Sequence, residues 1–176
     1  MIARYDRRYF IHFSLQTTCA VVFMFFTLFG LDHIGATSLI WAAGASSLAS
    51  SCFIVFGAPH TESAKPYRIV MGYLIAIVCG HLIRMLADAS CGGFLYFVCD
   101  NPIYQLHVIE AAAVISMCFA FIFMALFRCE HPPAAGLSIV MVLDIKYFKP
   151  MMLIFVAAVL LALIRRFFDK ALVRLV

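Results

Sequence analysis

Charged side chains are scarce in this sequence. Asp, Glu, Lys and Arg make up 12% of the 176 residues, whereas hydrophobic residues make up 65%, and the mean hydropathy is +1.03. A soluble domain usually carries about 25% charged residues, which cover its surface. No stretch is rich enough in Gly, Ser, Pro or acidic residues to form a linker or a disordered tail. The composition therefore excludes a soluble globule and predicts a single membrane domain over residues 1–176.

The motifs of common enzymes and metal sites are also missing. The sequence contains no P-loop, dinucleotide fingerprint, nucleophile elbow or zincin motif. We therefore expect no enzyme activity and no cofactor. The seven cysteines form no Cys-x-x-Cys pair and the nine methionines show no Met-x-x-Met spacing, which predicts no metal site. The net charge of +4 does not indicate nucleic-acid binding, because the basic residues lie at the borders of apolar segments.

What the sequence has in abundance is long apolar runs. Six segments are separated by short polar stretches and cover residues 12–31, 35–56, 69–86, 108–127, 134–143 and 151–168. The first follows a cluster of arginines, as a signal peptide would. It is too long for the apolar region of a signal peptide, and no small-residue cleavage site follows it. We interpret it as a retained first span of an all-α polytopic membrane protein.

The fifth segment is short for a membrane span. From Pro132 to Asp144 there are 13 residues, or about 20 Å of helix, against a hydrocarbon core about 30 Å thick. It either dips in and returns or crosses as a shortened, broken helix. Six crossings place ten basic residues inside and three outside, whereas five crossings give eight and five. The basic residues therefore favour six crossings, with residues 1–11 and 169–176 both cytoplasmic.

Six crossings divide into two halves of three with opposite orientation, which is the pattern of inverted-repeat transporters. The middle segments of the two halves contain a similar short sequence: Ala-Ala-Gly-Ala-Ser at 42–46 and Ala-Ala-Gly-Leu-Ser at 134–138. Small residues also occur in membrane helices for packing alone. This short similarity favours a 3+3 inverted repeat without establishing one.

The run His131-Pro132-Pro133 is the first candidate site. Proline suits the first turn of a helix, and a helix N-terminus favours anions. In transporters, broken helices of this kind form binding sites near the membrane midplane. The alternative is a surface loop in which His131 lies in water.

The second segment carries a hydroxyl stripe at helical spacing, made of Ser46, Ser47, Ser50 and Ser51. Such hydroxyls could line a path for an anion. They could equally bond back to their own helix and allow close packing. We predict that the start of the His-Pro-Pro helix meets Ser47, Ser50 and Ser51 and forms a substrate site there.

Two further features lie in and after the third segment. His81 and Arg84 are three residues apart, and Asp88 follows Arg84 by four, so an Arg84–Asp88 ion pair is predicted. Arg84 and His81 are candidate substrate ligands, although Arg84 could be purely structural. Cys91 and Cys99 share a loop that the topology places outside, where a disulfide between them could form, although both could equally be free thiols.

The sequence resembles the HPP family of integral membrane proteins, named for the motif seen here at 131–133. The likeness also covers Ala49 to Gly57 and the stretch from Ala64 to Gly72, although Tyr73 stands where the family's His is expected. Some members of that family are associated with nitrite transport. The resemblance implies a transporter or channel for a small, nitrite-like anion in a bacterial inner membrane.

The expected partners are the lipid bilayer and the anion, with a homo-oligomer left open. A transporter of another small solute or of a metal ion, and a non-transporting membrane subunit or scaffold, remain alternatives.

Overall fold

The computed structural model describes residues 7–33, 38–93, 102–144, 148–169, 171–173 and 175. Within these residues there is no strand, so the prediction of an all-α protein is confirmed. The elements in chain order are α1 (Arg7–His33), α2 (Ser38–Gly57), the 3-10 turn η1 (Glu62–Ala64), α3 (Pro66–Gly92), α5 (Pro102–Leu126), α6 (Pro132–Leu143) and α7 (Phe148–Phe167).

Four of the described helices are long and apolar enough to cross a bilayer, namely α1, α3, α5 and α7. Several begin before the predicted segments, because α3 and α5 start at a proline in the preceding polar stretch, a residue that suits the first turn of a helix. The helix α6 has 12 residues, which is about 18 Å of length. The predicted shortened helix after the two prolines is therefore present.

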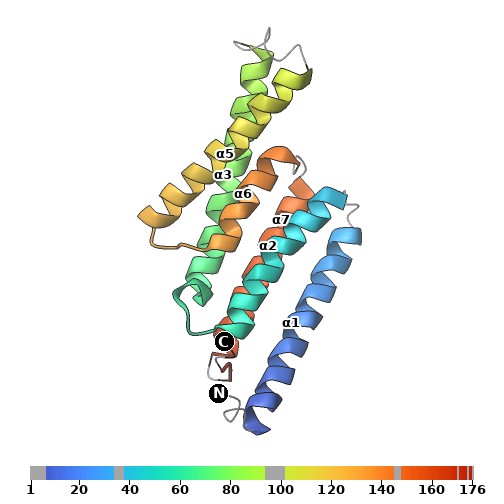
Figure 1. The fold of residues 1–176 in the computed structure, drawn as a ribbon, viewed down its shortest axis with the longest axis vertical. Coiled ribbons are helices and arrows are strands. Elements are labelled where there is room, and N and C mark those ends of the chain that lie inside the picture. The colour runs from blue at the N-terminus through green and yellow to red at the C-terminus, as the bar shows by residue number, and fades with distance from the viewer. Residues whose placement is uncertain are drawn as a thin grey trace.

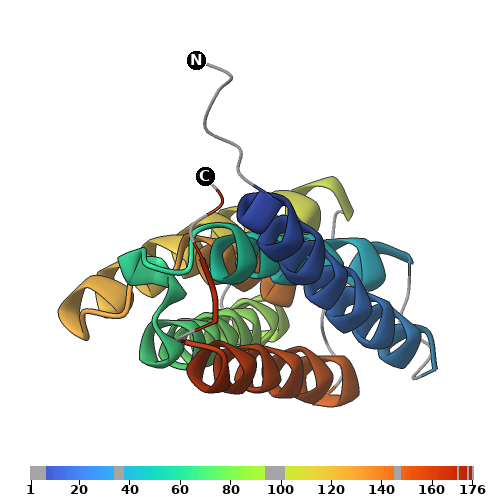
Figure 2. The same ribbon diagram turned by 90° about the horizontal axis from the view of Figure 1, so that it is seen from below.

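Among the described residues, successive α-helices run in opposite directions (Figure 1). The start of α1 and the end of α7 consequently lie at the same end of the bundle. The central helix α6 packs against α2, α3 and α5, whereas α1 lies at the edge of the bundle (Figure 2). An antiparallel order of the six described α-helices is what the predicted six crossings require.

The principal helix contacts have a two-fold pattern. Among the described residues, α1 packs on α2 and α5 packs on α6. The third helix of each half contacts the first two helices of the other half: α3 with α5 and α6, and α7 with α1 and α2. The other main contacts between α-helices join α2 to α6 and α3 to α7. Exchanging α1 with α5, α2 with α6 and α3 with α7 leaves this set unchanged, and the exchanged helices point in opposite directions (Figure 1). This is the arrangement that an inverted repeat predicts.

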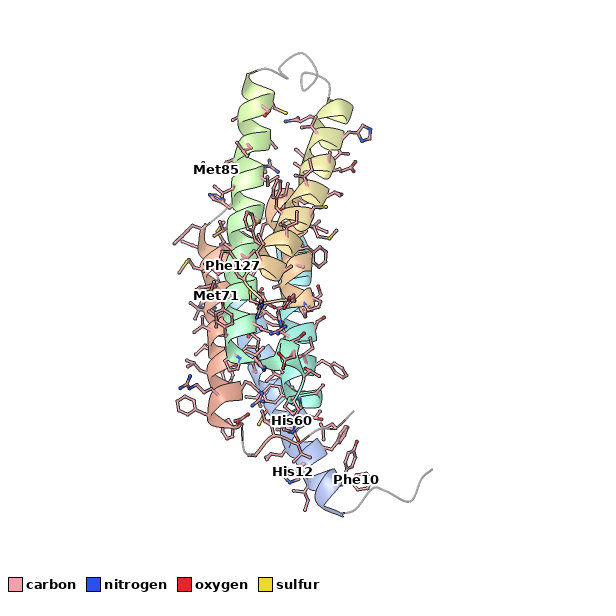
Figure 3. All side chains as sticks on the ribbon, turned by 90° about the vertical axis from the view of Figure 1, so that its left-hand side faces the viewer. Phe10, His12, His60, Met71, Met85 and Phe127 are labelled. Carbon is pink, nitrogen blue, oxygen red and sulfur yellow. The ribbon has the colours of Figure 1, made fainter. Side chains whose placement is uncertain are left out.

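The outer surface of the bundle is apolar. Phe10, Met85 and Phe127 lie on it (Figure 3), and each is more than half exposed. Large apolar side chains exposed in such number mark a surface that faces lipid rather than water. Together with the long apolar helices, they identify the chain as an integral membrane protein in contact with the bilayer.

Glycines bring α3 and α6 close together. A Cβ atom at Gly80 would lie 2.3 Å from the Cβ of Met141, and one at Gly72 would lie 2.8 Å from the Cβ of His131. Neither distance leaves room for a side chain. Small residues allow the same close approach in other membrane helix pairs, where packing rather than the hydrophobic effect drives association.

Candidate functional site

His131 occupies the N-cap of α6 and is completely buried. Its backbone is extended, with φ −135° and ψ 90°, as a residue before proline prefers. The chain arrives there from α5 through a tight turn in which Arg128 has a φ of 52°. The alternative in which His131 lies in water is therefore wrong. The Pro-Pro start fixes where α6 begins, and packing against α3 at Gly72 buries the imidazole.

Both ring nitrogens of His131 have partners. Nδ1 lies 3.0 Å from the carbonyl oxygen of Ser63 in η1, and a carbonyl can only accept. Nδ1 therefore carries a proton. Nε2 lies 2.8 Å from the hydroxyl of Ser51 on α2. The ring also contacts Tyr73 on α3, with 5.7 Å between ring centroids. One imidazole thus joins α2, α3, η1 and the start of α6.

The hydrogen bonds continue from Ser51 through two more side chains. The Ser51 hydroxyl lies 2.9 Å from the Tyr73 hydroxyl, which lies 3.0 Å from that of Ser47. Ser47 donates to the carbonyl of Pro133 over 2.7 Å. We call His131, Ser51, Tyr73 and Ser47 the His131 network. All four side chains are buried, and buried networks of this kind stabilise a structure only when their members are satisfied.

The His131 network is satisfied in two proton arrangements. With a neutral imidazole, Ser51 donates to Nε2, Tyr73 donates to Ser51, and Ser47 donates to Pro133. With an imidazolium, Nε2–H donates to Ser51, which turns its proton toward the Ser47 carbonyl at 3.1 Å, while Tyr73 donates to Ser47. Only hydroxyl rotations separate the two, since each hydroxyl can both donate and accept. Hydroxyl rotations alone therefore let the hydrogen bonds match either charge state of the imidazole.

A layer of ion pairs lies beside His131 at the η1 end of the bundle. Arg68 binds Glu130 over 2.7 Å and Glu62 over 2.8 Å, and Lys65 binds Glu62 over 2.7 Å. The hydrogen bond from Lys65, with the positive charges of Lys65 and Arg68, lowers the pKa of the Glu62 carboxyl. Exposed pairs of this kind add little stability, and they place two basic and two acidic groups at the end of the bundle where His131 lies.

The structure brings some of the predicted site residues together and separates others. Ser47 and Ser51 lie in the His131 network. Ser50 is exposed and donates to the Ser46 carbonyl of its own helix over 2.9 Å, as the packing alternative for the serine stripe described. His81 is exposed on α3, away from the network.

Arg84 is buried beside α6, where it binds Asp88 over 2.9 Å and donates to the Val142 carbonyl over 2.7 Å. The predicted Arg84–Asp88 pair is confirmed.

The start of α6 has no free backbone donor. Pro132 and Pro133 lack an N–H, and the amides of Ala134 and Ala135 both lie within hydrogen-bonding distance of the His131 carbonyl, at 3.0 and 3.3 Å. The expectation that backbone N–H groups here would hold an anion is therefore wrong. The prolines that begin the helix are the physical reason, since they replace the donors that a helix start normally offers. Any donors for an anion must come from side chains.

Tyr73 is the network residue that sequence reasoning missed as a site residue. Its side chain is fully buried and its hydroxyl bridges Ser47 and Ser51. The available signal was its position after Gly72, where the HPP resemblance leads one to expect histidine. A tyrosine hydroxyl both donates and accepts, so it can occupy the centre of such a chain of hydrogen bonds.

Two apolar grooves flank α1, and neither contains a residue of the His131 network. One, of about 520 Å³, lies between α1 and α7 and is lined by Phe23, Leu153 and Leu160 among others. The other, of about 600 Å³, lies between α1 and α2. Their linings suit acyl chains rather than an anion.

Cys91 is disulfide-bonded, and the Cys99 half of the predicted bond lies outside the described residues.

A buried polar network enclosed by antiparallel apolar helices defines a polytopic α-helical membrane protein. The family model described as "HPP, transmembrane region" matches residues 7–172. The chain belongs to this HPP transmembrane family, as the resemblance predicted.

Two transmembrane proteins of Dictyostelium discoideum are each 24% identical to the chain. One match covers 100 residues, which is 57% of this chain and 30% of the relative, and the other covers 98 residues, which is 56% and 27%. The matched region is thus less than a third of either relative. No solved structure matches.

Proposed function

We propose that the protein moves a small inorganic anion, such as nitrite, across a bacterial inner membrane, with both termini cytoplasmic and the His131 network as its substrate site. The observation that carries this proposal is a completely buried imidazole joined to three buried side-chain hydroxyls at the start of a shortened helix. Buried polar groups are costly in a membrane protein and commonly mark a substrate or ion pathway.

The chemistry of the network suits an anion that accepts hydrogen bonds. The hydroxyls of Ser47, Ser51 and Tyr73 can each turn a proton toward a nitrite oxygen. A protonated His131 supplies a positive charge, which offsets the cost of bringing an anion out of water. No catalytic step is part of the proposal.

The alternatives have less support. Within the described part of the chain, no three His, Cys, Asp or Glu side chains come close enough to hold a metal ion, which disfavours metal transport. A scaffold needs no polar network in its core, because apolar packing and small residues suffice to associate membrane helices.

Uptake of nitrite by proteoliposomes tests the proposal, and α2 offers a matched control. Ser51→Ala removes a buried member of the network, whereas Ser50→Ala makes the same change at an exposed neighbour. We expect Ser51→Ala and His131→Ala to reduce uptake at least tenfold and Ser50→Ala to leave it within twofold of wild type.

Uptake should also rise as the pH falls, because a protonated imidazole attracts the anion, and this dependence should disappear in His131→Ala. Folding of each variant is checked by size-exclusion chromatography. Equal uptake by folded Ser51→Ala and Ser50→Ala would show that the site is elsewhere. No nitrite uptake by the wild type at any pH would refute the proposed substrate.

A further inference from the structure

Two buried arginines occupy equivalent places in the two halves. Arg84 lies on α3 and Arg165 on α7, the third helix of each half, and their exposed fractions are 8% and 7%. Each forms an ion pair with the aspartate four residues later, Arg84 with Asp88 and Arg165 with Asp169. Both aspartates are largely exposed, so each guanidinium bridges the buried interior and the surface.

Each arginine also binds the carbonyl end of the middle helix of the other half. Arg84 donates to the carbonyl of Val142, in the last turn of α6, over 2.7 Å. Arg165 donates from two nitrogens to the carbonyl of Pro59, just beyond the end of α2, over 2.7 and 3.1 Å. A guanidinium is well suited to this place, because the C-terminal end of a helix carries partial negative charge and carbonyls without intrahelical partners.

The two arrangements, which we call the Arg84 clamp and the Arg165 clamp, lie at opposite ends of the bundle. Each clamp lies at the C-terminal end of a middle helix, α6 or α2, and these two helices run in opposite directions (Figure 1). The exchange of helices that preserves the principal contacts turns one clamp into the other. The His131 network lies between them. Tyr73 precedes Arg84 by 11 residues on α3, about 16 Å, and Ser51 precedes Pro59 by eight, about 12 Å.

We propose that the two clamps are the opposite gates of an alternating-access carrier, and that this structure, with both clamps formed, is the occluded state. In inverted-repeat transporters one repeat rocks against the other around a fixed site. Here each clamp ties the two halves together at one end only. Opening toward one side of the membrane requires the clamp on that side to separate while the other holds.

The chemistry permits such separation. Both aspartates are already in contact with solvent, so water entering the open end hydrates the carboxylate, the guanidinium and the freed helix carbonyl together. No charge is left buried and unpaired, which would otherwise make the opening prohibitively costly. The gating role rests on the proposed transport function, whereas the paired geometry of the clamps does not.

Hydrogen–deuterium exchange in lipid nanodiscs tests the proposal without any substrate. In Arg84→Gln, exchange should become at least fivefold faster for amides 140–144 and slower for the amides of Ala58, His60 and Thr61 at the opposite end. Arg165→Gln should give the mirror image. Slower exchange at the opposite end distinguishes a gate from a helix cap. An arginine that only caps a helix changes amide exchange only at its own end of the bundle.

Two more conservative substitutions control for the possibility that the arginine variants misfold. Asp88→Asn and Asp169→Asn remove the ion pair and keep the guanidinium–carbonyl bonds, so the same mirrored pattern is expected with a smaller amplitude. Exchange that rises only beside the altered clamp, in either pair of variants, overturns the gate proposal. Nitrite uptake by the wild-type protein is measured separately, so a failure of the proposed substrate is distinguished from a failure of the gates.

Discussion

The close contact between α3 and α6 at Gly80 makes a sharp prediction about stability. A methyl group at this position would lie 2.3 Å from the Met141 Cβ and 2.9 Å from the backbone oxygen of Ser138. Ordinary contact begins at 3.4 Å, so the two helices must separate by about 1 Å. Neither obstacle is the far end of a flexible side chain, and local rearrangement therefore cannot relieve the overlap. Forcing extra carbon into packed interiors typically costs about 1–3 kcal/mol.

The same substitution at Gly136 should have the opposite effect. That residue is exposed in the middle of α6, and a Cβ there would meet nothing within 4 Å. Alanine is more favourable than glycine inside a helix by roughly 0.5–1 kcal/mol. Gly136→Ala should therefore be neutral or slightly stabilising. For Gly80→Ala the cost of the steric overlap outweighs this gain in helix propensity. The net loss of folding stability is about 1–2 kcal/mol.

Thermal unfolding followed by circular dichroism in a single detergent measures both variants against the wild type. The expected result is a lower midpoint for Gly80→Ala and an unchanged or higher midpoint for Gly136→Ala. If Gly80→Ala were as stable as the wild type, the helices could not be as close as the structure has them. A similar loss in both variants would mean that the effect belongs to glycine in general rather than to this contact.

Four further predictions concern two buried side chains, the topology and one disulfide. Tyr73→Phe should lower nitrite uptake and destabilise the protein by about 1–2 kcal/mol, because two buried serines lose a partner, whereas Tyr67→Phe, at an exposed hydroxyl, should do neither. Gln16→Ala removes the bonds from α1 to the end of α2 and to the C-terminal segment, so limited proteolysis should cut that segment faster than in the wild type. Reporter fusions should place both termini in the cytoplasm, and peptide mapping without reductant should find Cys91 linked to Cys99; a C-terminus outside the cell would contradict the six-crossing topology.

The amino-acid sequence alone determined the class of protein and the approximate positions of its helices. Apolar runs of about 20 residues dictate membrane helices wherever they occur, and the two prolines fix the start of α6 at residue 132. The Arg84–Asp88 pair was also predictable, because residues four apart on a helix are neighbours whatever the helix packs against. These features depend only on local sequence.

Only the tertiary structure decided which side chains meet inside the bundle. In a soluble helix, polar residues mark the face turned to water, but here the face turned to lipid is as apolar as the core. The sequence could therefore not tell buried Ser51 from exposed Ser50. Nor could it show that Tyr73 joins the His131 network or that Arg165 binds Pro59, which lies 106 residues away. Such contacts depend on how the described apolar helices pack, and that packing is set by the fit of glycines and small side chains between them.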